Sequence, residues 1–317
     1  MNILNAFAKA LEEREVTTQL TKMSGLRQLK ESHKEKQLMQ LTRFPITVDA
    51  DLYRNAKSSS NPKGSLQSLF NFRQLVDPIP SLGSLYQPTI FSTEMMYGNI
   101  LGGMSVFPAD DFVISESKMS YEVNVFSGMD GIPGNWRPVY AVPEDWHSAD
   151  DSRFKRLTID LTVNKPSTLL EVIAGDEEFK WIVDGHKIKE LNIDTHIESI
   201  EMKYMLVGLR RPWLNPSIFQ MGNWYFSGED PGFCSSGSIT DNDGILPVIP
   251  SGIIIGKEIS INASWHKDDQ TIIDRHKVSG NALSLGPFSV SDNHTIQIIG
   301  WISEVVPFSP KKKSPPT

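Results

Sequence analysis

Residues 295–306 have the sequence TIQIIGWISEVV, in which apolar side chains fall on both faces of an extended chain. Ile298 and Ile299 cannot share one face of a strand, because successive side chains point to opposite sides. A strand that is apolar on both faces is typical of the middle of a sheet with a covering layer on each side. The segment around Trp301 therefore predicts a central β-strand near the C-terminus.

Several other segments alternate apolar and polar residues with a period of two, namely 119–125, 157–163, 200–206 and 259–265. This period is typical of strands that place one face on a core and the other in water. Asp184-Gly185 follows the apolar run Trp181 to Val183. An Asp-Gly pair tolerates the positive φ angles of a type I′ turn, so it predicts a tight hairpin.

These strands and their irregularly spaced Gly and Pro turns predict a mainly β protein, α+β overall, with no fixed-period repeat. We expect a β-sandwich or jelly-roll-like body over 104–308, as one domain or as two lobes with a seam near 165–195. The segment 309–317 contains only Pro, Ser, Lys and Thr and predicts a disordered tail.

The first 43 residues carry a helical spacing. Leu4, Phe7 and Leu11 recur at intervals of three and four residues, which indicates one apolar helix face. Over 1–43, eight Lys/Arg stand against five Glu, a net charge of +3, which leaves −10 for the rest of a chain whose total is −7. We predict a helical arm over 1–43. A linker with irregular and short-helical structure follows over 44–103, including a short helix from Leu66.

Composition excludes several classes of protein. Hydrophobic residues make up 39% of the 317 residues, enough to bury a core. The negative total charge argues against nucleic acid as a partner. The single cysteine, Cys234, excludes a disulfide within the chain. No stretch is long and apolar enough for an integral membrane span, and no signal peptide is apparent. We expect a soluble protein that is cytoplasmic, or exported by a route without a classical signal peptide.

No segment carries a specific catalytic or metal-binding motif. In a calcium loop built on Asp243-Gly244, positions one and twelve would be Ile239 and Pro250, which lack carboxylates. The loop at Cys234 lacks the G-x-S-x-G pattern of a nucleophile elbow. The third candidate is a set of histidines and aspartates, which we expect to be spread over a hairpin loop and a return strand that starts near Ile272. The set comprises His266, Asp268, Asp269, Asp274 and His276. We therefore predict no catalytic residue, no metal and no cofactor.

Aromatic residues beside arginines and prolines form the most distinctive clusters. Core packing, a protein interface and ligand binding are three interpretations of such clusters. The contact residues that we select for an interface or a ligand are Leu4, Phe7, Leu11, Trp136, Trp146, Arg210, Arg211 and Trp213.

Three functions are compatible with these patterns. The first is a non-enzymatic structural or interaction protein, a subunit of a homo- or hetero-oligomer whose partner is protein, either another copy or another subunit. The second is a membrane-acting, toxin-like protein that makes peripheral membrane contact through the N-terminal amphipathic helix. The third is a hydrolase or carbohydrate-binding protein that uses the Trp-rich loops. Whether the protein is an enzyme stays open, and the non-enzymatic reading is favoured.

Overall fold

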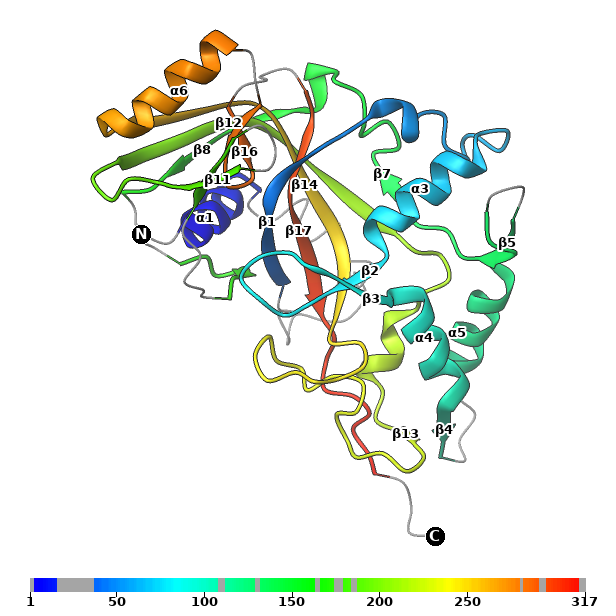
Figure 1. Cartoon of the computed structure of the whole chain (residues 1–317). Helices are drawn as coiled ribbons and strands as arrows, with labels where there is room; N and C mark the ends of the chain where they lie inside the picture. The colour runs from blue at the N-terminus through cyan, green and yellow to red at the C-terminus, as the bar shows by residue number, and fades with distance from the viewer. Residues whose placement is uncertain are drawn as a thin grey trace.

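A seven-stranded sheet forms the centre of the protein, seen here in a computed structural model (Figure 1). Its order is β7-β12-β14-β17-β1-β9, and β8 pairs with a second stretch of β12. All neighbours are antiparallel except β1 and β9. The strands are β1 (Gln37–Thr47), β7 (Tyr140–Val142), β8 (Lys155–Asp160), β9 (Leu170–Glu171), β12 (His196–Arg210), β14 (Val248–Ser264) and β17 (Gln297–Val305). The structure describes residues 3–15, 37–107, 112–128, 132–162, 166–173, 179–183, 187–279, 282–290 and 295–313.

Strand β17 lies between β14 and β1, as its two-sided apolarity predicts. Ile298 and Trp301 belong to a buried cluster on one face of the sheet, whereas Ile299 and Ile302 belong to a second cluster on the other face. Both faces of β17 are therefore buried, and neither is exposed to water. The prediction of a central strand with a layer on each side is confirmed.

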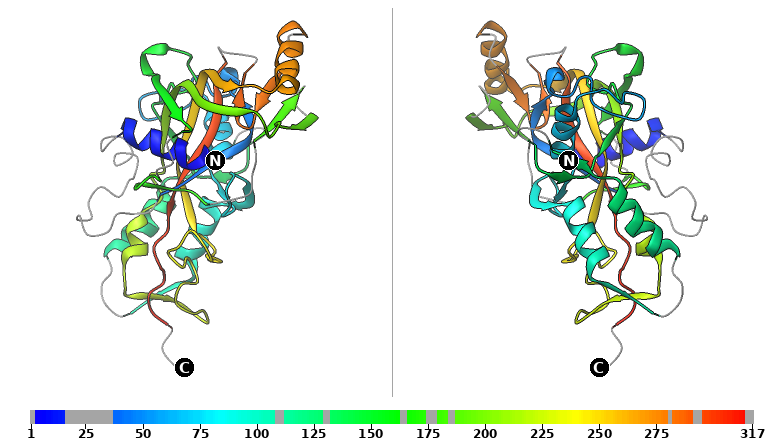
Figure 2. Two further views of the ribbon diagram at one scale, coloured as in Figure 1. Left: turned by 90° about the vertical axis from the view of Figure 1, so that its left-hand side faces the viewer. Right: turned by 90° about the vertical axis from the view of Figure 1, so that its right-hand side faces the viewer.

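One face is covered by helices and by a smaller sheet (Figures 1 and 2). The helices are α1 (Ile3–Glu15) and α6 (Lys267–Ser279). The smaller sheet has the order β11-β10-β15-β16, formed by β10 (Lys180–Val183), β11 (Lys187–Glu190), β15 (Leu283–Leu285) and β16 (Phe288–Ser289). β10 and β11 form the predicted antiparallel hairpin, although its Asp-Gly turn lies outside the described residues.

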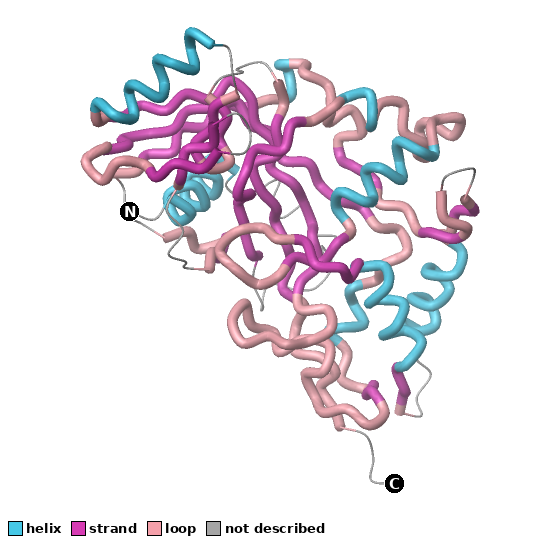
Figure 3. The backbone as a smooth tube through the Cα atoms, viewed as in Figure 1, coloured by secondary structure: helices cyan, strands magenta, loops and turns pink. Residues whose placement is uncertain are grey.

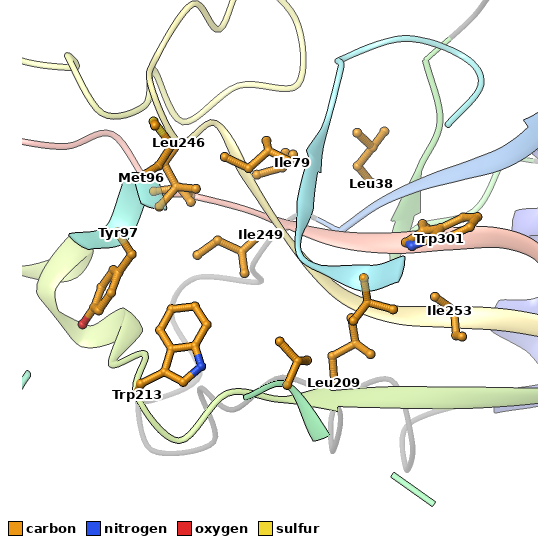
Figure 4. Packing of buried hydrophobic residues seen from close by; sticks show 14 of the residues in the cluster. Leu38, Ile79, Met96, Tyr97, Leu209, Trp213, Leu246, Ile249, Ile253 and Trp301 are labelled. Carbon is orange, nitrogen blue, oxygen red and sulfur yellow. The ribbon is translucent and has the colours of Figure 1, made fainter. Parts of the chain in front are cut away.

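The other face is covered by α3 (Leu66–Val76), α4 (Thr93–Gly103), α5 (Phe112–Val123), the 3-10 turn η3 (Pro216–Gln220) and long loops (Figure 3). Figure 4 shows Tyr97 of α4 beside Trp213, with Ile249 of β14 near both and Ile253 of β14 beside Trp301. Two-stranded pairs join these pieces: β2 (Pro78–Pro80) with β3 (Pro88–Ser92), β4 (Met104–Val106) with β13 (Trp224–Phe226), and β5 (Phe126–Ser127) with β6 (Asn135–Trp136).

Helix α3 confirms the short helix predicted from Leu66. Ser65 is its N-cap, and the Ser65 hydroxyl accepts a hydrogen bond from the backbone N–H of Ser68 at 3.1 Å. Leu69, Phe72 and Val76 then bury one side of the helix. Phe72 and Val76 share a core cluster with residues of β14 and β17, so this region packs with the body.

Three local predictions are wrong. Residues 37–43, expected as helix, begin β1, because pairing with β17 and β9 satisfies their backbone groups in the middle of the sheet. Residues 119–123, expected as strand, end helix α5. An alternation over only four apolar positions does not separate the period of a strand from that of a helix. The return strand expected near Ile272 is helix α6 instead, with Asp268 and Asp269 in its first turn, where acidic side chains favour a helix.

The fold class is as predicted: the protein is mainly β with helices, and it has an N-terminal helix. The jelly-roll arrangement stays a prediction. The start of the predicted tail differs, since Ser309 is buried and pairs with Ser235. Among the described residues, no helix is long and apolar enough to cross a membrane.

Candidate functional site

A groove of about 790 Å³ crosses the end of β12. It is lined by residues 204–206 and 208–210 of β12, by Arg211 directly after it, by residues 249–251 of β14 and by Glu304 of β17. Residues 142–143, Arg153 and Lys155 also line it, as does Glu15 at the end of α1. Pockets of this size, mainly apolar with a few polar groups, are the usual place to look for a ligand.

The edge of β12 is interrupted beside this groove. Residues 199–204 pair with β8, and residues 208–210 pair with β7. The chain leaves the sheet between these two strands, in the segment 143–154, so residues 205–207 pair with neither. Backbone N–H and C=O groups of successive residues alternate between the two sides of a strand, so at least one such pair faces this gap. The groove therefore offers backbone hydrogen-bonding groups as well as side chains.

The wall and rim of the groove carry positive charge. Arg210 is exposed, and its guanidinium lies 5.5 Å from the Tyr140 ring centroid. No described carboxylate forms an ion pair with Arg210. Arg153 is also exposed and pairs with Asp145 at 2.9 Å. Because the whole chain is acidic, this cationic rim is a local feature rather than an average property.

A hydrogen-bonded triad closes the end of the groove. Glu15 is buried, and its Oε1 accepts hydrogen bonds from the Tyr204 hydroxyl at 2.6 Å and from Lys155 Nζ at 2.7 Å. Burial, followed by the hydrogen bond and negative charge of Glu15, raises the pKa of Tyr204. Tyr204 therefore stays protonated at neutral pH. It acts as a hydrogen-bond donor to Glu15, not as a base.

Arg211 also lines the groove, but it holds the fold together. It is buried and donates hydrogen bonds to the carbonyl oxygens of Pro250 and Val76. Its Nε lies 3.7 Å from Oδ1 of the buried Asp77 at the end of α3. Asp77 in turn pairs with Arg73 at 3.2 Å. This chain of charges joins α3 to the ends of β12 and β14.

The predicted contact residues separate into two groups. Arg210 and Arg211 line the groove. The six others are buried in the protein's own core: Leu4, Phe7, Leu11, Trp136, Trp146 and Trp213. The apolar face of α1 packs against the sheet, so it is covered by the body rather than presented to a membrane or a neighbour. Six of the seven tryptophans are buried and Trp265 is half-buried, so the hydrolase or carbohydrate-binding alternative stays a prediction.

The loop around Cys234 is a structural feature. Asn242 organises it by donating to the Ser235 hydroxyl at 3.0 Å and to the Ser238 carbonyl at 2.8 Å, and by accepting from the Ser236 N–H at 2.9 Å. The thiol of Cys234 is fully buried, and burial raises its pKa to about 12. A thiol in this state is a poor nucleophile at neutral pH.

This burial predicts that Cys234 resists labelling. We expect the folded protein to react with iodoacetamide near pH 8 much more slowly than the urea-unfolded protein, because the thiolate is rare and covered. The mass shift of the intact protein over time measures the reaction. Rapid, complete labelling of the folded protein would show that the loop opens and that the thiol is available for chemistry.

The His/Asp set does not converge on one site. Asp269 is buried and accepts hydrogen bonds from Trp181 Nε1 at 2.9 Å and from the Asn192 N–H at 3.1 Å, which fixes α6 on the sheet. His266 accepts from the N–H of Asp268 at 3.3 Å at the start of α6. The described residues contain no group of three or more His, Cys, Asp or Glu side chains that could hold a metal ion.

Sequence reasoning missed Glu15 and the interrupted edge. Glu15 lies four residues after Leu11, on the apolar face of α1, and an acidic residue at such a position signals a buried partner. Lys155 and the gap at 205–207 carry no comparable local signal.

Comparisons with models of known protein families, with curated proteins and with solved structures find no match to this chain.

Proposed function

We propose that this protein is a non-enzymatic interaction protein, and that its groove holds an acidic, partly apolar segment of a partner protein in an extended conformation. The observation that carries the proposal is the interrupted edge of β12: residues 205–207 pair with β14 on one side, but no described strand pairs with them on the side of β7 and β8, where Met205 and Leu206 line the groove. A short extended peptide can complete such an edge with backbone hydrogen bonds, while pockets beside it select side chains.

The side chains of the groove specify the chemistry of this partner. Met205, Leu209 and Ile249 supply apolar surface. Arg210 and Arg153 supply positive charge on the rim and the wall. An extended segment that alternates acidic and apolar residues meets both requirements, because alternate side chains point to opposite sides. Complementary charge of this kind favours specific partners and speeds association.

The chain's own segment 16–36 is a less suitable occupant. Its flanking residues border the groove, since Glu15 lines it and Gln37 pairs with Glu304, which also lines it. However, residues 16–36 contain five Lys/Arg and two Glu, a net charge of +3. A basic segment is repelled by Arg210 and Arg153, so charge complementarity favours an acidic partner instead.

Selection from a displayed library of random short peptides tests this function. We expect the full-length protein to enrich acidic, partly apolar peptides, and Arg210→Glu to weaken their binding about tenfold, or ~1.4 kcal/mol. Arg156→Glu is the matched control, because Arg156 is an exposed arginine on β8 that does not line the groove. The proposal fails if no acidic peptides are enriched, or if both substitutions weaken binding equally.

A further inference from the structure

A second cavity, of about 270 Å³, shares no lining residue with the groove. Residues 140–141 and 144–147 line one part, Tyr53, residues 55–58 and Asn61 line another, and Leu69 and Phe72 of α3 complete it. Its volume suits a small functional group rather than a peptide segment. The cavity is separate from the groove, so the inference below does not rest on the function proposed above.

Aromatic rings line the inner part of this cavity. The ring centroid of Trp146 lies 5.0 Å from that of Tyr53, with the two planes 51° apart, and 5.3 Å from that of Phe72. Trp146 and Phe72 are almost fully buried, whereas Tyr53 is half-buried. The face of an aromatic ring carries partial negative charge and attracts cations.

A carboxylate at the edge of the cavity lacks a cationic partner. Glu144 Oε2 accepts hydrogen bonds from the hydroxyls of Ser58, at 2.9 Å, and Ser60, which orient it. No lysine or arginine among the described residues forms an ion pair with Glu144. Of the described lining residues, Lys57 is the only lysine or arginine, and its ammonium donates to the carbonyl oxygen of Pro62.

His147 adds a polar atom that lacks a hydrogen-bond partner. Its Nδ1 is buried and makes no hydrogen bond to any described residue. Burial lowers the pKa of His147, although the nearby Asp145 opposes this shift. The ring is therefore neutral at neutral pH and adds no positive charge. Because the Nδ1 atom is covered, it is closed to a ligand in the cavity, and His147 contributes a neutral ring to the wall.

We propose that this cavity binds the alkylammonium group of an amine ligand, with the cation against the half-buried Tyr53 ring and Glu144 as its counter-charge. Each feature selects a different property of the ligand. The rings favour a cation that is easily desolvated, and Glu144 favours positive over neutral ligands.

Saturation-transfer NMR on the full-length protein tests this site, with butylammonium chloride as the probe and butanol as its neutral counterpart. We expect transfer to butylammonium and little to butanol. Glu144→Gln keeps the size and an acceptor for Ser58 but removes the charge, and we expect it to weaken butylammonium binding about fivefold or more. Glu116→Gln is the matched control, because Glu116 is an exposed carboxylate on α5 outside the cavity.

A second variant, Tyr53→Leu, removes the half-buried ring and is expected to weaken butylammonium binding while Glu144 stays in place. Thermal melts of all variants establish that each is folded at the temperature of the NMR measurement. The proposal is overturned if butanol binds as well as butylammonium, if the Glu144 and Glu116 variants behave alike, or if no transfer to butylammonium is seen.

Discussion

A chain that starts at Phe44 is expected not to fold. Removing residues 1–43 deletes α1 and most of β1, which lies between β17 and β9 in the central sheet. The deleted side chains include five that are fully buried: Phe7, Leu11, Leu38, Met39 and Leu41. Burial of each contributes about 1.5–3 kcal/mol, and the net stability of a protein is only about 5–15 kcal/mol. The stabilisation lost with these side chains therefore exceeds the net stability that the remaining chain can sustain.

Circular dichroism and urea denaturation of the shortened and full-length chains measure this effect. A cooperative unfolding transition in the shortened chain would contradict the expectation and would support an independent arm.

A pair of phenylalanine substitutions gives a finer test. Phe7→Ala should cost about 3–5 kcal/mol, because it opens a cavity in the core. Phe112→Ala, at a side chain that is 74% exposed, should change stability by less than about 0.5 kcal/mol.

Asp77→Ala is expected to destabilise the protein by about 3–5 kcal/mol, the cost of leaving a buried charge without its partner. Asp77 is 2% exposed, and its removal leaves the guanidinium of Arg211 buried without the carboxylate at 3.7 Å. Burial alone lowers the pKa of Arg211 and raises the pKa of Asp77, and their mutual attraction opposes both shifts. Removing one member therefore exposes the full desolvation cost of the other.

The urea midpoints of three variants measure this coupling. Asp51→Ala is the control, because the pair that Asp51 forms with Arg54 is about 70% exposed on both sides and should contribute less than about 1 kcal/mol. The double variant Asp77→Ala with Arg211→Met removes both charges, and we expect it to be more stable than Asp77→Ala alone. If the double variant is no more stable than Asp77→Ala alone, the charges are not coupled and the explanation is wrong.

Much of the fold was predictable because its signals are local. The two-sided apolar run around Trp301 predicts a central strand, and alternation from Ile200 to Leu206 predicts a strand with one face on a core. The spacing of Leu4, Phe7 and Leu11 predicts helix α1. Each pattern is formed by residues that are close together along the chain.

The errors lie where local signals were short or overruled. Residues 37–41 form a strand because β17 and β9 lie on either side of them, and their helical spacing is too brief to oppose those backbone hydrogen bonds. Met119 to Val125 alternates over only four apolar positions, which helix α5 also accommodates. The selection of Trp136, Trp146 and Trp213 as contact residues stays a prediction: all three are buried, and Trp146 lines the second cavity.

The sequence by itself determined the β-rich class, the N-terminal helix, the β10–β11 hairpin and the central position of β17. Side-chain period and turn chemistry act between near neighbours, so these features can be read along the chain. Only the tertiary structure decided the candidate sites. The groove joins Glu15, Arg210 and Glu304, and the second cavity joins Tyr53 to Trp146. Residues so far apart in the chain meet only after the sheet has formed, because strand pairing sets which of them become neighbours.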